Sequence, residues 1–120
     1  MGEFKPAPVK AIVGIEVLES LDIRVGTIER VEEVPRSDKL MKLIVNFGDH
    51  TRTIIAGIKK ERANPLEVQG RQALFVLNLA PRKMAGEVSE GMLFDIGYAD
   101  GLVPVLALPE RPVPNGVRAG

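Results

Sequence analysis

Apolar and polar residues alternate in short runs from Leu21 onward, with turn residues between the runs. The first run, residues 21–25, alternates with period two, which predicts a half-buried β-strand. The phase changes at Gly26, after which Ile28 and Val31 continue the same strand. Because a glycine at a phase change is typical of a bulge or a sharp bend, we expect the strand to turn a barrel corner there.

The second and third runs predict an antiparallel hairpin. Residues 40–47 place four apolar side chains on one face: Met41, Leu43, Val45 and Phe47. The turn Gly48-Asp49-His50 then leads directly into residues 51–58. So short a connection favours antiparallel pairing of the two strands.

A short helix and two further strands complete the pattern. Asn64 is a suitable N-cap, Pro65 fits the first helical position and Glu67 lies where a capping-box carboxylate belongs. Residues 71–79 are almost entirely apolar, which predicts a central strand, and residues 91–96 alternate again. Three phenylalanines lie in phase with these core positions: Phe47, Phe75 and Phe94.

Three strands, a short helix and two strands is the order of an all-β, five-stranded OB-fold barrel. An SH3-like barrel or a small sandwich is the alternative on this evidence. The chain of 120 residues has room for one such domain. We expect an N-terminal extension over residues 1–14 and the OB-fold domain over residues 15–120.

Two apolar segments lie outside the predicted barrel. Residues 9–21 have helix-like spacing, which predicts an N-terminal helix, and residues 102–108 form an apolar tail in which Pro104 indicates an edge strand or an extended arm. So much apolar surface beside a small barrel favours burial against a second copy, through a C-terminal dimerisation arm over about residues 98–120. Packing of the arm on its own barrel is the alternative.

The composition argues against several classes of protein. The chain has no cysteine and a single histidine, His50, in a polar turn. No phosphate-binding glycine loop, nucleophile elbow or cluster of metal ligands is present, so we expect neither an enzyme nor a cofactor or metal. No run approaches the roughly 18 apolar residues of a membrane helix, and no signal peptide is evident, so a cytoplasmic protein is expected.

Positive charge is concentrated in the middle of a chain whose net charge is zero. Residues 36–83 hold ten basic and four acidic side chains, whereas both flanking segments are acidic. Such a segment can attract phosphates, although solvated lysines on strands would produce the same count. Because the central phenylalanines are expected in the core, a base-stacking platform is largely missing, which favours recognition of the shape and backbone of a structured RNA.

Several motifs resemble the tRNA-binding domain family. They are Leu21-Asp22-Ile23-Arg24-Val25-Gly26-Thr27-Ile28, Ser37-Asp38-Lys39-Leu40, Arg52-Thr53-Ile54-Ile55-Ala56-Gly57-Ile58, Asn78-Leu79-Ala80-Pro81-Arg82-Lys83-Met84-Ala85-Gly86 and Ser89-Glu90-Gly91-Met92. The family includes free-standing tRNA-binding proteins, the C-terminal appendage of methionyl-tRNA synthetases and CsaA-type chaperones. The resemblance covers about residues 15–118 and implies an OB barrel that dimerises and binds the outside corner of folded tRNA.

The resemblance and the basic middle section together give the predicted tRNA-binding residues: Lys39, Lys42, Arg52, Lys59, Asn78, Arg82, Lys83, Ser89 and Met92. Three of them have a purely structural alternative. Met92 is in phase with the core, Ser89 can stabilise a turn, and Asn78 can satisfy buried backbone groups.

The predicted function is therefore binding of folded tRNA by a cytoplasmic homodimer, with possible assistance to a methionyl-tRNA synthetase in trans. The alternative is a CsaA-like export chaperone that binds unfolded preproteins through apolar surface.

Overall fold

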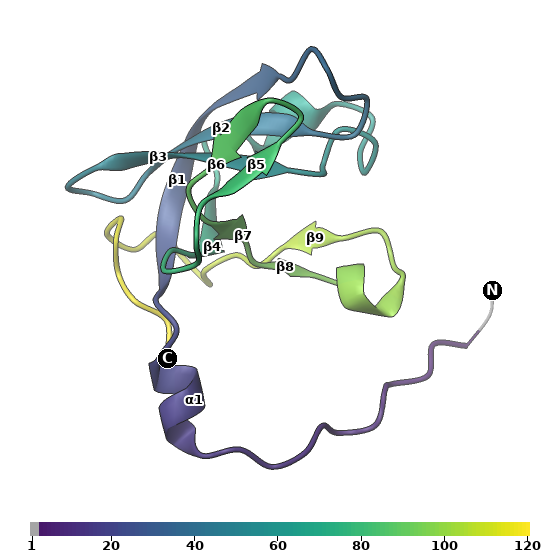
Figure 1. Ribbon diagram of the computed structural model, residues 1–120, viewed down its shortest axis with the longest axis vertical. Helices are drawn as coiled ribbons and strands as arrows, with labels where there is room; N and C mark the ends of the chain where they lie inside the picture. Colours follow the sequence, from purple (N-terminus) through teal and green to yellow (C-terminus); the bar gives the residue numbers. More distant parts are fainter. Residues whose placement is uncertain (1–2) are drawn as a thin grey trace.

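The long strand β1 (Ile23–Glu33) organises the main sheet of the computed structural model, which describes residues 3–120. The sheet has five antiparallel strands in the order β3-β2-β1-β4-β7 and curls into a nearly closed barrel (Figure 1). Its other strands are β2 (Met41–Asn46), β3 (Thr51–Ala56), β4 (Gln72–Val76) and β7 (Met92–Leu93). The predicted all-β, OB-type fold is confirmed.

Strand β1 serves both halves of the barrel because its pairing changes along its length. Its first half pairs with β4 and its second half with β2. Val25 and Gly26 are buried in succession, so the predicted phase change at Gly26 is confirmed. The bulge, however, lies between Ile28 and Arg30, not at Gly26 as predicted. Close packing explains why residue 26 is a glycine. A Cβ at this position would lie only 2.6 Å from the Val45 side chain and 2.7 Å from the Phe47 ring.

The core fills the inside of the barrel. The alternating face of β2 is fully buried, as predicted, and the rings of Phe47 and Phe75 meet edge to face with centroids 5.5 Å apart. This geometry is favourable for two aromatic rings. The expectation that Phe94 lies in the core is wrong, because its side chain is 40% exposed. The alternation here has the opposite phase from the one expected: Leu93 is buried, so Met92 and Phe94 face outward.

The predicted fifth strand over residues 91–96 is divided between two sheets. Its first part is β7, whereas β8 (Asp95–Ile96) pairs with β9 (Val105–Leu106) in a separate two-stranded sheet. The helix η2 (Tyr98–Asp100) lies between β8 and β9. The helix predicted after β3 is the 3₁₀-helix η1 (Pro65–Val68), in which the Asn64 side chain accepts from the amide of Leu66 as an N-cap should.

A further hairpin was not predicted from the sequence. Strands β5 (Arg82–Met84) and β6 (Glu87–Ser89) form a two-stranded ribbon that projects from the barrel. Its turn residues, Ala85 and Gly86, both have positive φ, at 50° and 84°. This is the backbone of a two-residue type I′ turn, whose twist matches that of the flanking strands. We refer to residues 82–89 as the ribbon.

The two ends of the chain behave differently. Helical spacing predicted a helix within residues 9–21, but only α1 (Ile15–Glu19) is helical, and the segment before it extends away from the barrel (Figure 1). Val9 and Ile12 on this segment are fully exposed. The C-terminal tail instead returns to β1, where Val25 donates to Val117 and Ala119 donates to Ile23 through their backbones. No helix among residues 3–120 is long and apolar enough to cross a membrane.

Candidate nucleic-acid interface

The nine predicted tRNA-binding residues fall into two groups in the structure. In one group the polar atoms are held by other parts of the fold, and in the other the side chains are exposed. The first group contains Lys42, Arg52, Lys59, Asn78 and Ser89, and the second contains Lys39, Arg82, Lys83 and Met92.

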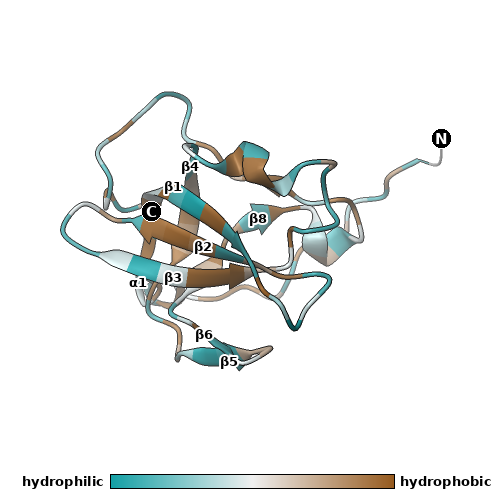
Figure 2. Cartoon of the chain, turned by 90° about the horizontal axis from the view of Figure 1, so that it is seen from above, coloured by the Kyte–Doolittle hydropathy of each residue, from teal (hydrophilic) through white to brown (hydrophobic). Residues whose placement is uncertain are grey.

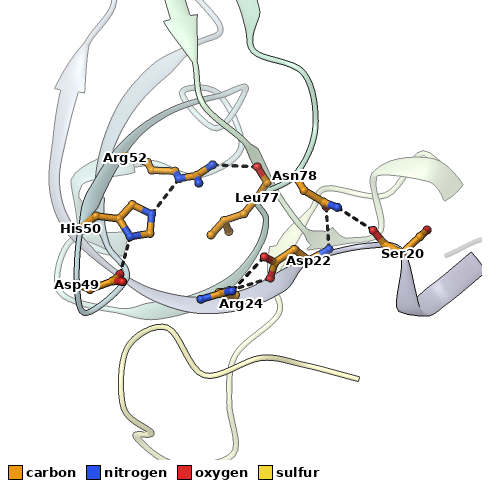
Figure 3. A network of polar contacts seen from close by, with 8 residues as sticks. All are labelled: Ser20, Asp22, Arg24, Asp49, His50, Arg52, Leu77 and Asn78. Atoms are coloured by element: carbon orange, nitrogen blue, oxygen red, sulfur yellow. Dashed lines mark hydrogen bonds and ion pairs between the residues drawn. The ribbon is translucent and has the colours of Figure 1, made fainter. Parts of the chain in front are cut away.

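Arg52 on β3 ties the end of β4 to the segment before β7. Its Nη1 donates to the carbonyl of Leu77 at 2.9 Å and to that of Glu90 at 3.0 Å, and its Nε donates to Nε2 of His50 at 3.0 Å (Figure 3). Nδ1 of the same ring is hydrogen-bonded to Oδ1 of Asp49 at 2.6 Å. This hydrogen bond from His50 lowers the pKa of Asp49. The Arg52 guanidinium is thus used within the fold.

Ser89 and Glu90 close the barrel beside β3. The Ser89 hydroxyl is buried, accepts from the amide of Ile55 at 2.9 Å and donates to the carbonyl of Gly91 at 2.8 Å. The Glu90 carboxylate accepts from the amide of Thr53 at 2.9 Å, while its own amide donates to the Thr53 carbonyl at 2.8 Å. These groups satisfy the edge of β3 in place of a neighbouring strand. We call residues 89–91 together with Arg52 the clasp.

Asn78 joins the end of β4 to the entry of β1. Its Oδ1 accepts from the amide of Asp22 at 2.7 Å, and its Nδ2 donates to the carbonyl of Ser20 at 2.7 Å (Figure 3). Asp22 in turn holds Arg24 at 2.7 Å, and this hydrogen bond lowers the pKa of Asp22. The structural alternative for Asn78 holds in part: the side chain bonds two backbone groups, but the residue is exposed, so these groups are not buried as the alternative expected.

Two of the predicted lysines are ion-paired within the molecule. Lys42 on β2 contacts Glu87 of the ribbon at 3.1 Å, which links the ribbon to the barrel. Lys59, just after β3, pairs with Glu33 at the end of β1 and donates to the carbonyl of Ser37 at 3.4 Å. About 30% of each lysine side chain is exposed. Each lysine charge is balanced by a neighbouring carboxylate. Lys42 and Lys59 therefore add less to the positive electrostatic potential at the surface than a count of basic residues suggests.

The remaining cations face solvent. Lys39 lies in the loop between β1 and β2, and Arg82 and Lys83 form the first strand of the ribbon. Within residues 3–120 none of these three side chains makes an ion pair. The ribbon lies at the edge of the molecule, and β5 is strongly hydrophilic (Figure 2). Met92 is 47% exposed, so the alternative that it belongs to the core does not hold.

Arg36, which was not among the predicted site residues, lies at the turn of the ribbon that carries two of these cations. It is exposed in the β1–β2 loop and reaches the turn of the ribbon, because a Cβ added to Gly86 would lie 3.5 Å from its Nη1. The local sequence Pro35-Arg36-Ser37-Asp38 indicates only a loop. The one signal in the sequence was the excess of positive charge between residues 36 and 83.

The family model described as a tRNA binding domain matches residues 23–118, which include the whole barrel, the clasp and the ribbon. The chain belongs to the tRNA-binding domain family. The family resemblance inferred from the motifs is thereby confirmed.

Relatives of this tRNA-binding domain occur both within a synthetase and as separate chains. It is 41% identical over 113 residues to a methionine–tRNA ligase of Bacteroides fragilis, a match that spans 94% of this chain and 16% of the ligase. The solved structure of a MetRS-related protein from Pyrococcus horikoshii has a TM-score of 0.84 and 34% identity, covering 92% of this chain and 100% of that one. The chaperone CsaA from Bacillus anthracis has a TM-score of 0.78 and 31% identity, with 92% and 100% covered.

Proposed function

We propose that this chain binds folded tRNA through the exposed cations of the ribbon and the neighbouring loop, as a binding module and not as a catalyst. The observation that carries the proposal is the pair Arg82 and Lys83, which project from the barrel without a carboxylate partner in residues 3–120. Together with Lys39 they supply positive charge for phosphate oxygens, which dominate affinity for nucleic acids.

Recognition of shape fits the kind of surface available. Phe47 and Phe75 are buried and cannot stack on bases, while the cations stand on a stiff ribbon whose strands are paired and anchored by Lys42. A rigid array of charges selects among RNA backbones by their spacing, which differs between folded and unfolded RNA. The proposal therefore includes a preference for folded over denatured tRNA.

The test is a charge reversal of the ribbon, Arg82→Glu with Lys83→Glu. The matched control is Arg71→Glu with Arg111→Glu, which changes the net charge equally at two exposed arginines that line a groove on other elements. We expect the ribbon variant to lose at least about 100-fold in affinity for bulk tRNA, and its log–log salt slope to fall by about two. The measurement is a filter-binding titration at two salt concentrations, with denatured tRNA as competitor.

Equal losses in both double variants would show that only net charge matters and would remove the ribbon from the site. Unchanged binding by the ribbon variant would do the same. Melting temperatures of all three proteins establish that each is folded, since surface charges of this kind contribute little to stability.

We further propose that the chain acts in the cytoplasm as a homodimer. The observation in favour is apolar surface left uncovered in two places. The N-terminal segment exposes Val9 and Ile12 completely, and the outer face of β7–β9 exposes Met92, Ile96 and Val105 by about half. Such adjoining apolar groups are typical of an interface. Sedimentation equilibrium would show a mass of two chains, and a mass of one chain at micromolar concentration would reject the dimer.

Two partners follow from the relatives. Because a methionine–tRNA ligase contains a similar domain, we propose that the chain can deliver tRNA to such a synthetase in trans.

The alternative function is binding of unfolded preproteins, favoured by the same apolar surface and by the likeness to a CsaA chaperone. The titration separates the two functions. If the chain is a tRNA-binding protein, binding is sensitive to salt and an unfolded polypeptide displaces tRNA poorly. If it is a chaperone, it binds the unfolded polypeptide, and that binding responds weakly to salt.

A further inference from the structure

The guanidinium of Arg36 bridges two elements that are far apart in the sequence. It starts from the loop between β1 and β2 and ends against the turn of the ribbon, 3.5 Å from the position of a Cβ on Gly86. The loop and the turn lie close together at the same end of the molecule (Figure 1). Arg36 therefore stands at the turn of the ribbon whose first strand carries Arg82 and Lys83, although the sequence separates it from them by more than forty residues.

The acidic groups around Arg36 are already engaged by other cations. Asp38 of the same loop pairs with Lys60 at 3.2 Å, and this hydrogen bond lowers the pKa of Asp38. Glu33 pairs with Lys59, and Glu87, the carboxylate of the ribbon, pairs with Lys42. Within residues 3–120 Arg36 makes no ion pair of its own. Its charge is thus directed to solvent at a point where no carboxylate neutralises it.

The loop that carries Arg36 is held in one conformation. The Ser37 hydroxyl accepts from the amides of Lys39 and Leu40 at 3.1 and 3.0 Å, and the Ser37 amide donates to Val34 at 3.0 Å. The amide of Lys59 donates to the Lys39 carbonyl at 3.1 Å, which fastens the loop to the segment after β3. A prearranged cation loses less conformational entropy on binding than one on a free loop.

The turn opposite Arg36 is built from the two smallest side chains. Ala85 and Gly86 occupy the tip of the ribbon, where both have positive φ. The two residues of the turn itself add little bulk beside the guanidinium. A phosphodiester backbone can therefore come close to Arg36 and to the ribbon at the same time, and arginine can donate two parallel hydrogen bonds to one phosphate.

From this arrangement we infer that Arg36 and the ribbon cations Arg82 and Lys83 form one cradle along the edge of the ribbon for the sugar–phosphate backbone of an RNA strand, with Arg36 holding a phosphate at the tip. Because successive strand residues point to opposite faces, Arg82 and Lys83 reach the RNA strand from its two sides. The inference rests on the proposed binding of tRNA and adds to it a residue and a path for the strand. The strand runs along the ribbon and past its turn, towards the β1–β2 loop.

The experiment compares Arg36→Glu with Arg111→Glu, an equal charge change at an arginine that is 77% exposed and lies outside the cradle. We expect Arg36→Glu to weaken binding of bulk tRNA by about 10- to 100-fold and to lower the salt slope by about one. Arg36→Lys should keep the slope but lose part of the affinity, because a lysine offers no planar fork. Arg111→Glu should change affinity by no more than about threefold.

The outcomes separate the inference from the function on which it rests. Equal affinities of the Arg36→Glu and Arg111→Glu proteins, while Arg82→Glu with Lys83→Glu still abolishes binding, would overturn the inference and leave the function intact. Absence of tRNA binding by the unaltered protein would overturn the function. If Arg36→Glu lowers the melting temperature, Arg36→Gln replaces it in the titration. A slope reduced by about one then supports the inference, and an unchanged slope rejects it.

Discussion

The clasp and the first strand of the ribbon meet where Ser89 pairs with Arg82, yet their polar side chains have different partners. In the clasp, the side chains of Ser89 and Arg52 hydrogen-bond to backbone groups that no neighbouring strand pairs. In the ribbon, Arg82 and Lys83 belong to a hairpin whose backbone is already paired, and their charges face solvent. The difference follows the two strands of the hairpin. Ser89 and Glu87 of β6 lie beside the barrel and bond to β3 and to β2. Arg82 and Lys83 of β5 make no ion pair within residues 3–120 and stay available to a ligand.

This difference changes how the Ser89-Glu90-Gly91-Met92 motif is understood. Its resemblance to the family motif suggested an RNA contact at Ser89, but the Ser89 hydroxyl makes two hydrogen bonds inside the barrel. Gly91 has the same structural character, because a Cβ there would lie 2.9 Å from the Val76 carbonyl oxygen. In this chain the motif closes the barrel, and by closing it the motif fixes where the ribbon projects.

Substitution of Ser89 tests whether this residue stabilises the barrel or contacts RNA. Ser89→Ala removes the acceptor for the buried amide of Ile55, so the free energy of unfolding should fall by about 1–3 kcal/mol. The tRNA affinity of the folded protein should stay within about twofold of the original. Urea unfolding and filter binding at a temperature where both proteins are folded measure the two effects.

Ser20→Ala is the control for this substitution, because the Ser20 hydroxyl is exposed and donates only to the Val17 carbonyl. Its cost should be about 0.5 kcal/mol or less. A Ser89→Ala protein that kept its stability but lost tRNA binding would place Ser89 in the interface after all, and the distinction between clasp and ribbon would fail at that residue.

The sequence was informative wherever local pattern and fold agree. The alternation of Leu43 and Val45 predicted a half-buried strand, and both residues are fully buried on β2. The Asn64 cap was likewise predicted from local chemistry and is present. The ribbon escaped prediction because residues 82–89 lack an alternating apolar pattern. Their turn also has Ala85 at a position with positive φ, where asparagine or glycine is the usual signal.

The site was less predictable than the fold because ion pairing joins distant parts of the chain. Counting charges found the basic segment, but whether a cation is free depends on partners far away in sequence. Lys42 is neutralised by a carboxylate 45 positions further along, at Glu87. Arg36 was overlooked because its neighbours in the sequence indicate only a loop. It comes to lie at the turn of the ribbon only when the β1–β2 loop folds against Gly86.

The smallest expected effect lies at the turn of the ribbon, where Ala85 has φ of 50°. A left-handed conformation costs an alanine about 1 kcal/mol, while asparagine tolerates it and forms the preferred Asn-Gly pair of a type I′ turn. Ala85→Asn should therefore raise the free energy of unfolding by about 0.5–1 kcal/mol, measured by urea denaturation. Because the inferred RNA strand passes the turn beside Arg36, tRNA affinity should fall slightly; unchanged affinity would mean that the ribbon acts only as a rigid support for Arg82 and Lys83. A loss of affinity in the stabilised protein would mean that the RNA approaches the tip so closely that a larger side chain obstructs it, which makes Ala85 part of the contact surface. A fall in stability would contradict the strain assigned to Ala85.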